Sequence, residues 1–306
     1  MSVGDELRVG PVRALRAGAR SRGRHRHTVR VYTPRRALEF RLGRLWAYRG
    51  TIPVFGRTLV RRRFVGTWLG YLWIPLRPTL GMLSKGLFFG GMLHVGSGTR
   101  PYLIFLMVGQ ASWDFFDRAV YWGYRGIRSQ RKVLQLLPVP WTAALGGSIL
   151  LAVADAMPFV GIAFIAAVYY KFAQGSFYIT LQFPQGLVRL CLGSLLLVGW
   201  AFATSLIVSP LIVKVRDLRF IVRYMIGFWY FLTPVLYAVS ALPAKYQGLA
   251  VYNPLTAPIE YIKDALLGTG PPESVSILVS AVGVAVLLPI GLLFCSYMER
   301  QSHASL

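Results

Sequence analysis

Charged side chains within apolar stretches are the residues of this chain best placed to do chemistry. Asp155 interrupts the apolar segment Trp141–Tyr170, and Arg189 directly precedes the apolar segment Leu190–Val213. A charge at membrane depth is a functional candidate by default, because it is costly there unless it is paired or hydrated. We therefore predict an ion pair between Asp155 and Arg189. A structural contact and a proton relay are both compatible with such a pair.

Signatures of catalysis are otherwise scarce. The sequence lacks the phosphate-binding pattern GxxxxGK[ST], which excludes ATP hydrolysis by that route, and it lacks HExxH, CxxC and GxSxG. The four histidines are too scattered to indicate a metal site. Cys191 and Cys295 both lie in apolar stretches, which excludes a disulfide scaffold. We expect no catalytic residue, metal or cofactor on this chain.

The composition indicates a polytopic membrane protein. Of the 306 residues, 55% are hydrophobic and only 15% are charged, whereas about a quarter of an average soluble domain is charged. A transmembrane helix requires roughly 20 predominantly apolar residues. We predict an all-α integral membrane protein with six transmembrane helices, at Gly66–His94, Pro101–Trp122, Trp141–Tyr170, Leu190–Val213, Tyr224–Ala244 and Ser274–Met298.

The basic residues predict the orientation of these helices. Residues 1–65 contain 17 arginines against three acidic residues, a net +14 of the +23 carried by the whole chain. If this end is cytoplasmic, most of the remaining loop Lys and Arg fall on the same side, as the positive-inside rule requires. Both termini are therefore predicted to be cytoplasmic. The basic residues concerned are Arg125, Arg128, Arg131, Lys132, Lys214, Arg216, Arg219, Arg223 and Arg300.

Residues 1–50 are predicted to be a basic, largely disordered cytoplasmic arm, and residues 301–306 a cytoplasmic tail after the six-span region 66–300. The charge of the arm could bind nucleic acid, contact anionic lipid headgroups or hold the N-terminus in the cytoplasm. No interleaved aromatic residues or known nucleic-acid module accompany the charge. We therefore favour topology and membrane lipid contact, and expect no nucleic acid partner.

Residues 51–65 have the pattern of an amphipathic helix in the membrane interface, because apolar residues alternate with arginines. A plain basic cluster beside the membrane is the alternative. The residues concerned are Phe55, Arg57, Leu59, Arg61, Arg62 and Arg63.

Residues 129–138 predict a short helix between the second and third spans. Ser129 can cap its start and Pro138 can stop it. A helix of this length is not stable alone, so we expect it to dock onto another surface. An ordinary connecting turn is the alternative. The residues concerned are Ser129, Arg131, Lys132, Val133, Leu134 and Leu137.

The outer segment Ala241–Glu273 is too long for a tight connection. Within it, residues 258–267 predict an amphipathic helix that ends at Gly268. Its apolar face would hold Ile259, Ile262, Ala265 and Leu266, and its polar face Glu260, Lys263 and Asp264. Such a segment can dip into the outer leaflet or cover a pore, and a solvated loop is the alternative.

Three stretches share the order and spacing of a known family. They are residues 61–73 (RRRFVGTWLGYLW) with the later Pro78, residues 214–219 (KVRDLR), and residues 232–237 (LTPVLY) followed by Leu242-Pro243 and Asn253-Pro254-Leu255. Together they resemble the permease subunits of type-2 ABC exporters that move polysaccharides and polyol phosphates, such as O-antigen, galactan, capsule and teichoic acid. The arm is longer than in that pattern, and Thr67 replaces the usual serine, so no role is transferred to the arm.

The resemblance implies a transport subunit and not an enzyme. Two copies of the chain would form the membrane half of an exporter in the cytoplasmic membrane, and two separate ATPase subunits would bind ATP and magnesium. Residues 129–137 would form the coupling helix, residues 51–65 the interface helix, and the outer segment the gate. The cargo would be a lipid-linked cell-surface polysaccharide.

Aromatic side chains are candidates for the lining of a translocation path, because their rings offer apolar faces and Tyr and Trp add a polar tip. The interfacial aromatic belts of membrane proteins are the alternative. The candidates are Trp113, Phe116, Tyr121, Trp122, Tyr224, Trp229 and Tyr230.

Two other functions remain open at this point. One is a type-2 ABC exporter of a drug or lipid. The other is an integral membrane enzyme that acts on lipid-linked sugars, which predicts a carboxylate or histidine cluster near one membrane face.

Overall fold

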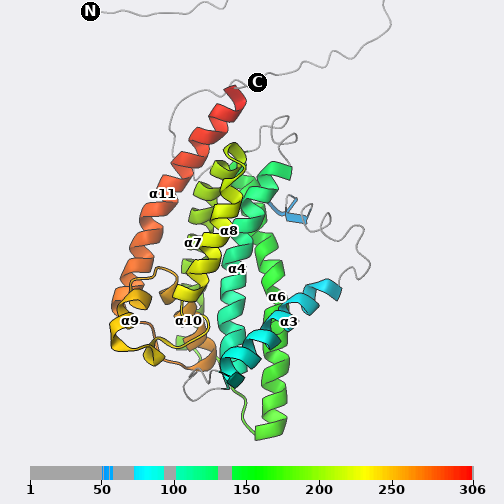
Figure 1. Cartoon of the computed structure of the whole chain (residues 1–306), viewed down its shortest axis with the longest axis vertical. Helices are drawn as coiled ribbons and strands as arrows, with labels where there is room; N and C mark the ends of the chain where they lie inside the picture. The colour runs from blue at the N-terminus through cyan, green and yellow to red at the C-terminus, as the bar shows by residue number, and fades with distance from the viewer. Residues whose placement is uncertain are drawn as a thin grey trace, which may run out of the picture. The chain divides into compact units, whose positions relative to one another are not determined.

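The computed structural model describes residues 50, 52–54, 56–57, 72–92, 101–129 and 140–304, and the regular elements among these residues are all helical. Figure 1 shows their arrangement. In chain order they are α3 (Trp73–Lys85), the π-helical η2 (Gly86–Met92), α4 (Tyr102–Ser129), α6 (Trp141–Gln174), α7 (Gln185–Lys214), α8 (Leu218–Leu232), the 3-10 helix η3 (Val239–Ala241), α9 (Ala244–Val251), α10 (Thr256–Leu267) and α11 (Ser274–Ala304).

Three helices in the described part of the chain are long and apolar enough to cross a membrane: α6, α7 and α11. They contain the third, fourth and sixth predicted spans, whose positions are thereby confirmed. The first predicted span coincides with α3 and η2 over residues 73–92, while its two ends lie outside the described residues. The chain is thus an all-α membrane protein, and the full set of six crossings stays a prediction.

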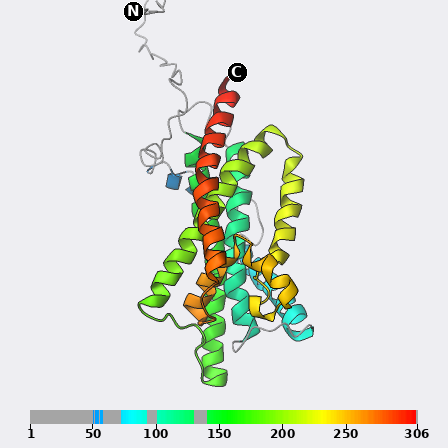
Figure 2. The ribbon, with the colours of Figure 1, turned by 90° about the vertical axis from the view of Figure 1, so that its left-hand side faces the viewer.

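Helix α4 is the centre of the packing. It lies along α6 on one side and α7 on another, while α11 packs on α7 and α10 packs on both α7 and α4 (Figures 1 and 2). Glycine permits the close approach of α11 to α7: a Cβ at Gly283 would lie 2.3 Å from the ring of Trp200, and a Cβ at Gly199 would lie 2.9 Å from Val284. Small residues at such crossings let membrane helices pack closely.

The second predicted span is too short. Helix α4 continues past Trp122 to Ser129, so Arg125 and Arg128 are exposed helical residues and not loop residues. Ser129 is the last residue of α4, and the helix predicted to follow it lies outside the described residues. The other predicted coupling residues, Arg131, Lys132, Val133, Leu134 and Leu137, lie outside the described residues.

The fifth predicted span, Tyr224–Ala244, is not one helix. Helix α8 begins earlier, at Leu218, and ends at Leu232, and Thr233 is extended (φ −91°, ψ 138°). The cause is Pro234, since the ring of a proline disfavours the helical conformation of the residue before it. The stretch was predicted as one span because it lacks charged residues, but Pro234 ends the helix within it.

The start of the predicted interface helix lies against α6. Residues 52–54 and 56–57 are helical, and Ile52 packs on the cluster that contains Trp141 and Leu145. Gly56 is buried, and a Cβ there would lie 3.2 Å from the carbonyl oxygen of Gly147. Arg57 is exposed, whereas Phe55, Leu59, Arg61, Arg62 and Arg63 lie outside the described residues.

The helix predicted at residues 258–267 is confirmed as α10, which begins two residues earlier. Gly268 ends it in the left-handed conformation (φ 65°) and donates its N–H to the carbonyl of Asp264 at 2.8 Å. Its predicted polar face is wrong, because Lys263 and Asp264 are 2% and 4% exposed. The helix is enclosed by neighbouring elements and does not have one face in solvent.

Candidate functional site: polar contacts between the helices and the α10 cavity

Four of the predicted path residues meet in one aromatic group between α4 and α8. The ring centres of Trp113 and Tyr230 are 5.4 Å apart, and those of Phe116 and Trp229 are 5.6 Å apart, both pairs edge to face. Trp113, Phe116 and Tyr230 are buried in the main hydrophobic cluster, and Trp229 is partly buried against it. Within the single chain these rings pack against one another. Their role as path lining stays a prediction.

The other three path candidates lie apart from that group. Tyr121 and Trp122 are edge to face with ring centres 5.1 Å apart, and Arg125 donates a hydrogen bond to the hydroxyl of Tyr121. Tyr224 is 79% exposed on α8. The sequence pattern grouped seven aromatic residues that the fold separates into two clusters and one exposed side chain.

Asp155 of α6 faces α4. Its carboxylate accepts a hydrogen bond from the indole nitrogen of Trp122 at 3.0 Å and lies 3.9 Å from Nη1 of Arg118. The Nε of Arg118 also donates to Asp114 at 3.3 Å. Asp114 and Arg118 are four residues apart and share one face of the helix, so the spacing in the sequence could have indicated this pair.

The predicted pair between Asp155 and Arg189 is not formed. Arg189 donates to Oδ2 of Asp264 at 2.7 Å, and Oδ1 of the same carboxylate accepts the backbone N–H of Gly270 at 2.8 Å. The reason lies in the packing, since α10 covers the start of α7 where Arg189 stands, whereas Asp155 is turned toward α4. The contact fastens α10 to α7.

Sequence reasoning missed a buried polar contact that joins three helices. The side-chain oxygen of Gln110 accepts hydrogen bonds from Lys85 at 2.9 Å and from the hydroxyl of Tyr230 at 2.7 Å. The Lys85 ammonium also lies 4.6 Å from the centre of the Tyr230 ring. A glutamine within an apolar helix was the only available signal, and its partners on α3 and α8 depend on the fold.

Asn253, the first residue of the Asn-Pro-Leu motif, connects two segments through the hydrogen bonds of its side chain. Its amide nitrogen donates to the carbonyl of Leu232 at 3.2 Å and to Thr233 Oγ1 at 2.9 Å. Its amide oxygen accepts from Trp229 at 3.0 Å and from the backbone N–H of Leu255 at 3.1 Å. One side chain therefore satisfies polar groups at the broken end of α8 and at the start of α10.

Lys263 of α10 is the most deeply buried charged side chain in the described part of the chain. Its ammonium donates to the carbonyl oxygens of Pro234 at 2.6 Å and Val235 at 3.2 Å, and lies 3.7 Å from the centre of the Phe105 ring. Gly109 makes room for it, since a Cβ there would lie 2.7 Å from Lys263 Cε. Lys263 thus donates hydrogen bonds to carbonyl oxygens that have no helical partner because α8 ends before Pro234.

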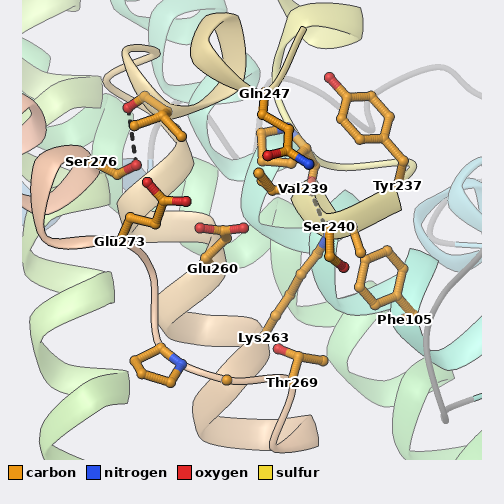
Figure 3. A pocket seen from close by; sticks show the side chains of 15 residues that line it. Phe105, Tyr237, Val239, Ser240, Gln247, Glu260, Lys263, Thr269, Glu273 and Ser276 are labelled. Atoms are coloured by element: carbon orange, nitrogen blue, oxygen red, sulfur yellow. Dashed lines mark hydrogen bonds between the residues drawn. The ribbon is translucent and has the colours of Figure 1, made fainter. Parts of the chain in front are cut away.

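A cavity of about 370 Å³ lies beside α10, and we call it the α10 cavity. Its walls come from α4, the segment after α8 with η3, α9, α10, the segment that follows α10 and the first turn of α11. Figure 3 shows Glu260 and Glu273 at one side and Gln247 and Ser240 at the other. Helices α9 and α10, which line the cavity, lie at the end of the helices opposite the C-terminus (Figure 1).

Burial alters the acid–base behaviour of α10. It raises the pKa of Glu260 to about 7; nearby Lys263 opposes this rise and Glu273 adds to it. Burial also lowers the pKa of Lys263 to about 7, against the attraction of Glu260. Both shifts disfavour charge, so a ligand able to donate hydrogen bonds to Glu260 would stabilise its ionised form.

No family model matches the chain. Over 199 residues, 65% of this chain and 72% of the relative, it is 28% identical to the O-antigen export system permease protein RfbA of Myxococcus xanthus. A protein of the same name from Klebsiella pneumoniae is 24% identical over 71% of this chain and 80% of its own length. The polysialic acid transport protein KpsM of Escherichia coli is 22% identical over 76% and 87%. These homologues confirm the predicted resemblance to permeases of polysaccharide export.

Proposed function

We propose that this chain is the permease subunit of an ATP-driven exporter that moves a lipid-linked cell-surface polysaccharide across the cytoplasmic membrane. The observation that carries the proposal is the similarity of about two thirds or more of the chain to permeases of O-antigen and polysialic acid export. The three apolar helices long enough to cross a membrane agree with it.

The proposal includes an assembly. Two copies of the chain, each with six spans and both termini in the cytoplasm, work with two ATPase subunits that bind ATP and magnesium. The missing GxxxxGK[ST] pattern supports a separate ATPase. Residues 129–137 are the proposed contact with that partner, and residues 51–65 are the proposed interface helix beside it.

The nature of the cargo separates this proposal from an exporter of drugs or lipids. Depletion of the chain in its host is expected to remove the surface polysaccharide while drug sensitivity stays normal. The opposite pattern would identify a different cargo. Turnover of a lipid-linked sugar by the purified chain without any ATPase would show that the protein is a membrane enzyme.

The coupling assignment is tested by replacing Val133 and Leu134 together with Asp. Charge in place of the apolar contact is expected to abolish export and to disconnect ATP hydrolysis from the presence of glycan, while membrane insertion stays normal. The measurements are glycan export into vesicles and ATPase activity of the complex. The control is the double variant Val133→Ile and Leu134→Met, which keeps the surface apolar. Export at the native rate in the Asp variant would refute the assignment.

A further inference from the structure

The α10 cavity has the size and lining of a small-molecule site. Its volume of about 370 Å³ is near the lower end of the range of about 300–1,000 Å³ that such sites occupy. Apart from Phe105 of α4, its lining residues all come from one stretch of the chain, residues 234–276. This volume suits one small polar unit better than a long segment of polymer.

The two carboxylates of the cavity are available to a ligand. Glu260 and Glu273 both line the cavity, and Glu260 interacts electrostatically with Lys263 and Glu273. Among the described residues, the salt bridges to carboxylates involve Asp114, Asp155 and Asp264 and neither glutamate. Lys263, the nearest cation, directs its hydrogen bonds to the carbonyls of Pro234 and Val235. Glu260 is half-buried, and a buried acceptor without a donor is unfavourable. The cavity therefore favours a ligand rich in donors.

The remaining lining suits a sugar ring. The hydroxyls of Ser240 and Thr269 and the amide of Gln247 face the same space (Figure 3). The ring of Tyr237 offers a surface on which the C–H groups of a sugar can pack. The described residues contain no group of three His, Cys, Asp or Glu side chains that could hold a metal ion, which argues against a metal ion in this cavity.

The charge of the cavity selects among sugars. The lining holds two carboxyl groups against the one ammonium of Lys263. When ionised, the carboxyl groups accept hydrogen bonds from hydroxyl groups, attract an ammonium group and repel a further carboxylate. We infer that the α10 cavity is a binding subsite for one neutral or amino-substituted monosaccharide unit, and that it rejects acidic sugars such as uronic and sialic acids. As a subsite for exported glycan, this inference rests on the proposed function.

The position of the cavity agrees with that role. Pro234, Tyr237 and Ala238 of its wall lie in the segment after α8, the helix that carries Trp229 and Tyr230 of the predicted translocation path. Asn253 bonds Trp229 and lies between α9 and α10, both of which line the cavity. Through Asn253 the cavity wall is thus connected to one residue of the predicted path.

The test measures sugar binding to the full chain in lipid nanodiscs by saturation-transfer NMR and titration calorimetry. The probes are methyl glucoside, glucosamine and glucuronate, which are neutral, cationic and anionic. Methyl glucoside and glucosamine are expected to bind at least about tenfold more tightly than glucuronate, a difference of about 1.4 kcal/mol. Equal affinity for glucuronate, or no binding of any sugar, would overturn the inference.

Variants locate the binding. Glu260→Gln combined with Glu273→Gln is expected to weaken glucosamine binding about tenfold and to remove the discrimination against glucuronate, a change that simple misfolding would not produce. Ser240→Trp, at an exposed position of the wall, is expected to block all three sugars. Asp217→Asn removes one exposed carboxylate beyond the far end of α7, is the control for loss of a carboxylate outside the cavity, and should bind like the native chain. Native binding in the Trp variant would refute the location.

The two proposals fail separately. If depletion abolishes the surface polysaccharide but no sugar binds the cavity, the subsite is refuted and the exporter function stands. If the sugars bind as expected but the chain exports no glycan with an ATPase, the exporter function is refuted and the cavity remains a sugar-binding site.

Discussion

Lys263 is buried because backbone groups, and not water, solvate its ammonium. The break at Pro234 leaves carbonyl oxygens of residues 234 and 235 without helical donors, and Lys263 supplies donors to both. The Phe105 ring adds a cation–π contact, and Gly109 leaves the space that the side chain occupies. One lysine thus joins α10 to the end of α8 and to α4.

Lys263→Met tests this role. Methionine fills a similar volume but leaves two buried carbonyls without donors, which we expect to cost about 1–3 kcal/mol. The melting temperature of the detergent-solubilised protein should fall by several degrees. Lys245→Met, at an exposed position of α9 outside the cavity wall, is the matched control and should melt like the native protein. Equal melting temperatures of both variants would show that Lys263 does not hold these elements together.

At the scale of elements, α11 is held to α7 by close contact at glycines. Trp200 of α7 is fixed by hydrogen bonds from its indole nitrogen to the carbonyl and the hydroxyl of Ser280, each at 3.1 Å. Its ring lies over Gly283, and Gly291 permits a similar approach to Leu206. The ring cannot move aside without losing those bonds, so the contact is intolerant of added volume.

Gly283→Ala and Gly161→Ala should therefore have opposite effects. A Cβ at Gly283 meets the Trp200 ring at 2.3 Å, and we expect overpacking to cost about 1–3 kcal/mol. A Cβ at Gly161 of α6 meets no atom within 4 Å, so the alanine should stabilise its helix by about 0.5–1 kcal/mol. Thermal melting in detergent measures both. Destabilisation by Gly161→Ala, or none by Gly283→Ala, would contradict this account of the packing.

At the scale of the whole molecule, the helices have two ends of different character. Helices α9 and α10, which line the α10 cavity, lie at one end, opposite the C-terminus (Figures 1 and 2). Helix α4 begins at the same end, where the hydroxyl of Tyr102 donates a hydrogen bond to the carbonyl of Leu236. Its last turn, which carries Arg125 and Arg128, therefore lies at the other end. The positive-inside rule assigns the arginine-rich end to the cytoplasm.

Cysteine labelling tests that orientation. In a background with Cys191→Ser and Cys295→Ala, Thr269→Cys is expected to react with a membrane-impermeant maleimide in intact spheroplasts. Arg128→Cys should react only after permeabilisation. Both native side chains are exposed, so access to the reagent depends on the membrane. Reaction of both cysteines from the same side would exclude the proposed topology.

The sequence by itself determined the features that depend on local composition. Apolar length located α6, α7 and α11, and Gly268 located the end of α10, because hydropathy and the left-handed conformation are properties of short stretches. The break in α8 was also predictable, since Pro234 acts on its neighbour alone. The order of the motifs along the chain indicated the family resemblance, because each motif is also a short stretch of sequence.

Only the tertiary structure decided which polar groups meet. Arg189 pairs with Asp264 and not with Asp155, and Lys263 is buried although the helical pattern places it on a polar face. Ion pairs and burial depend on the elements that surround a residue on every side, and helical periodicity describes only one of those elements. The α10 cavity is likewise lined by Phe105 of α4 and by residues of the stretch 234–276, and helical periodicity does not show which side chains of that stretch face a common space.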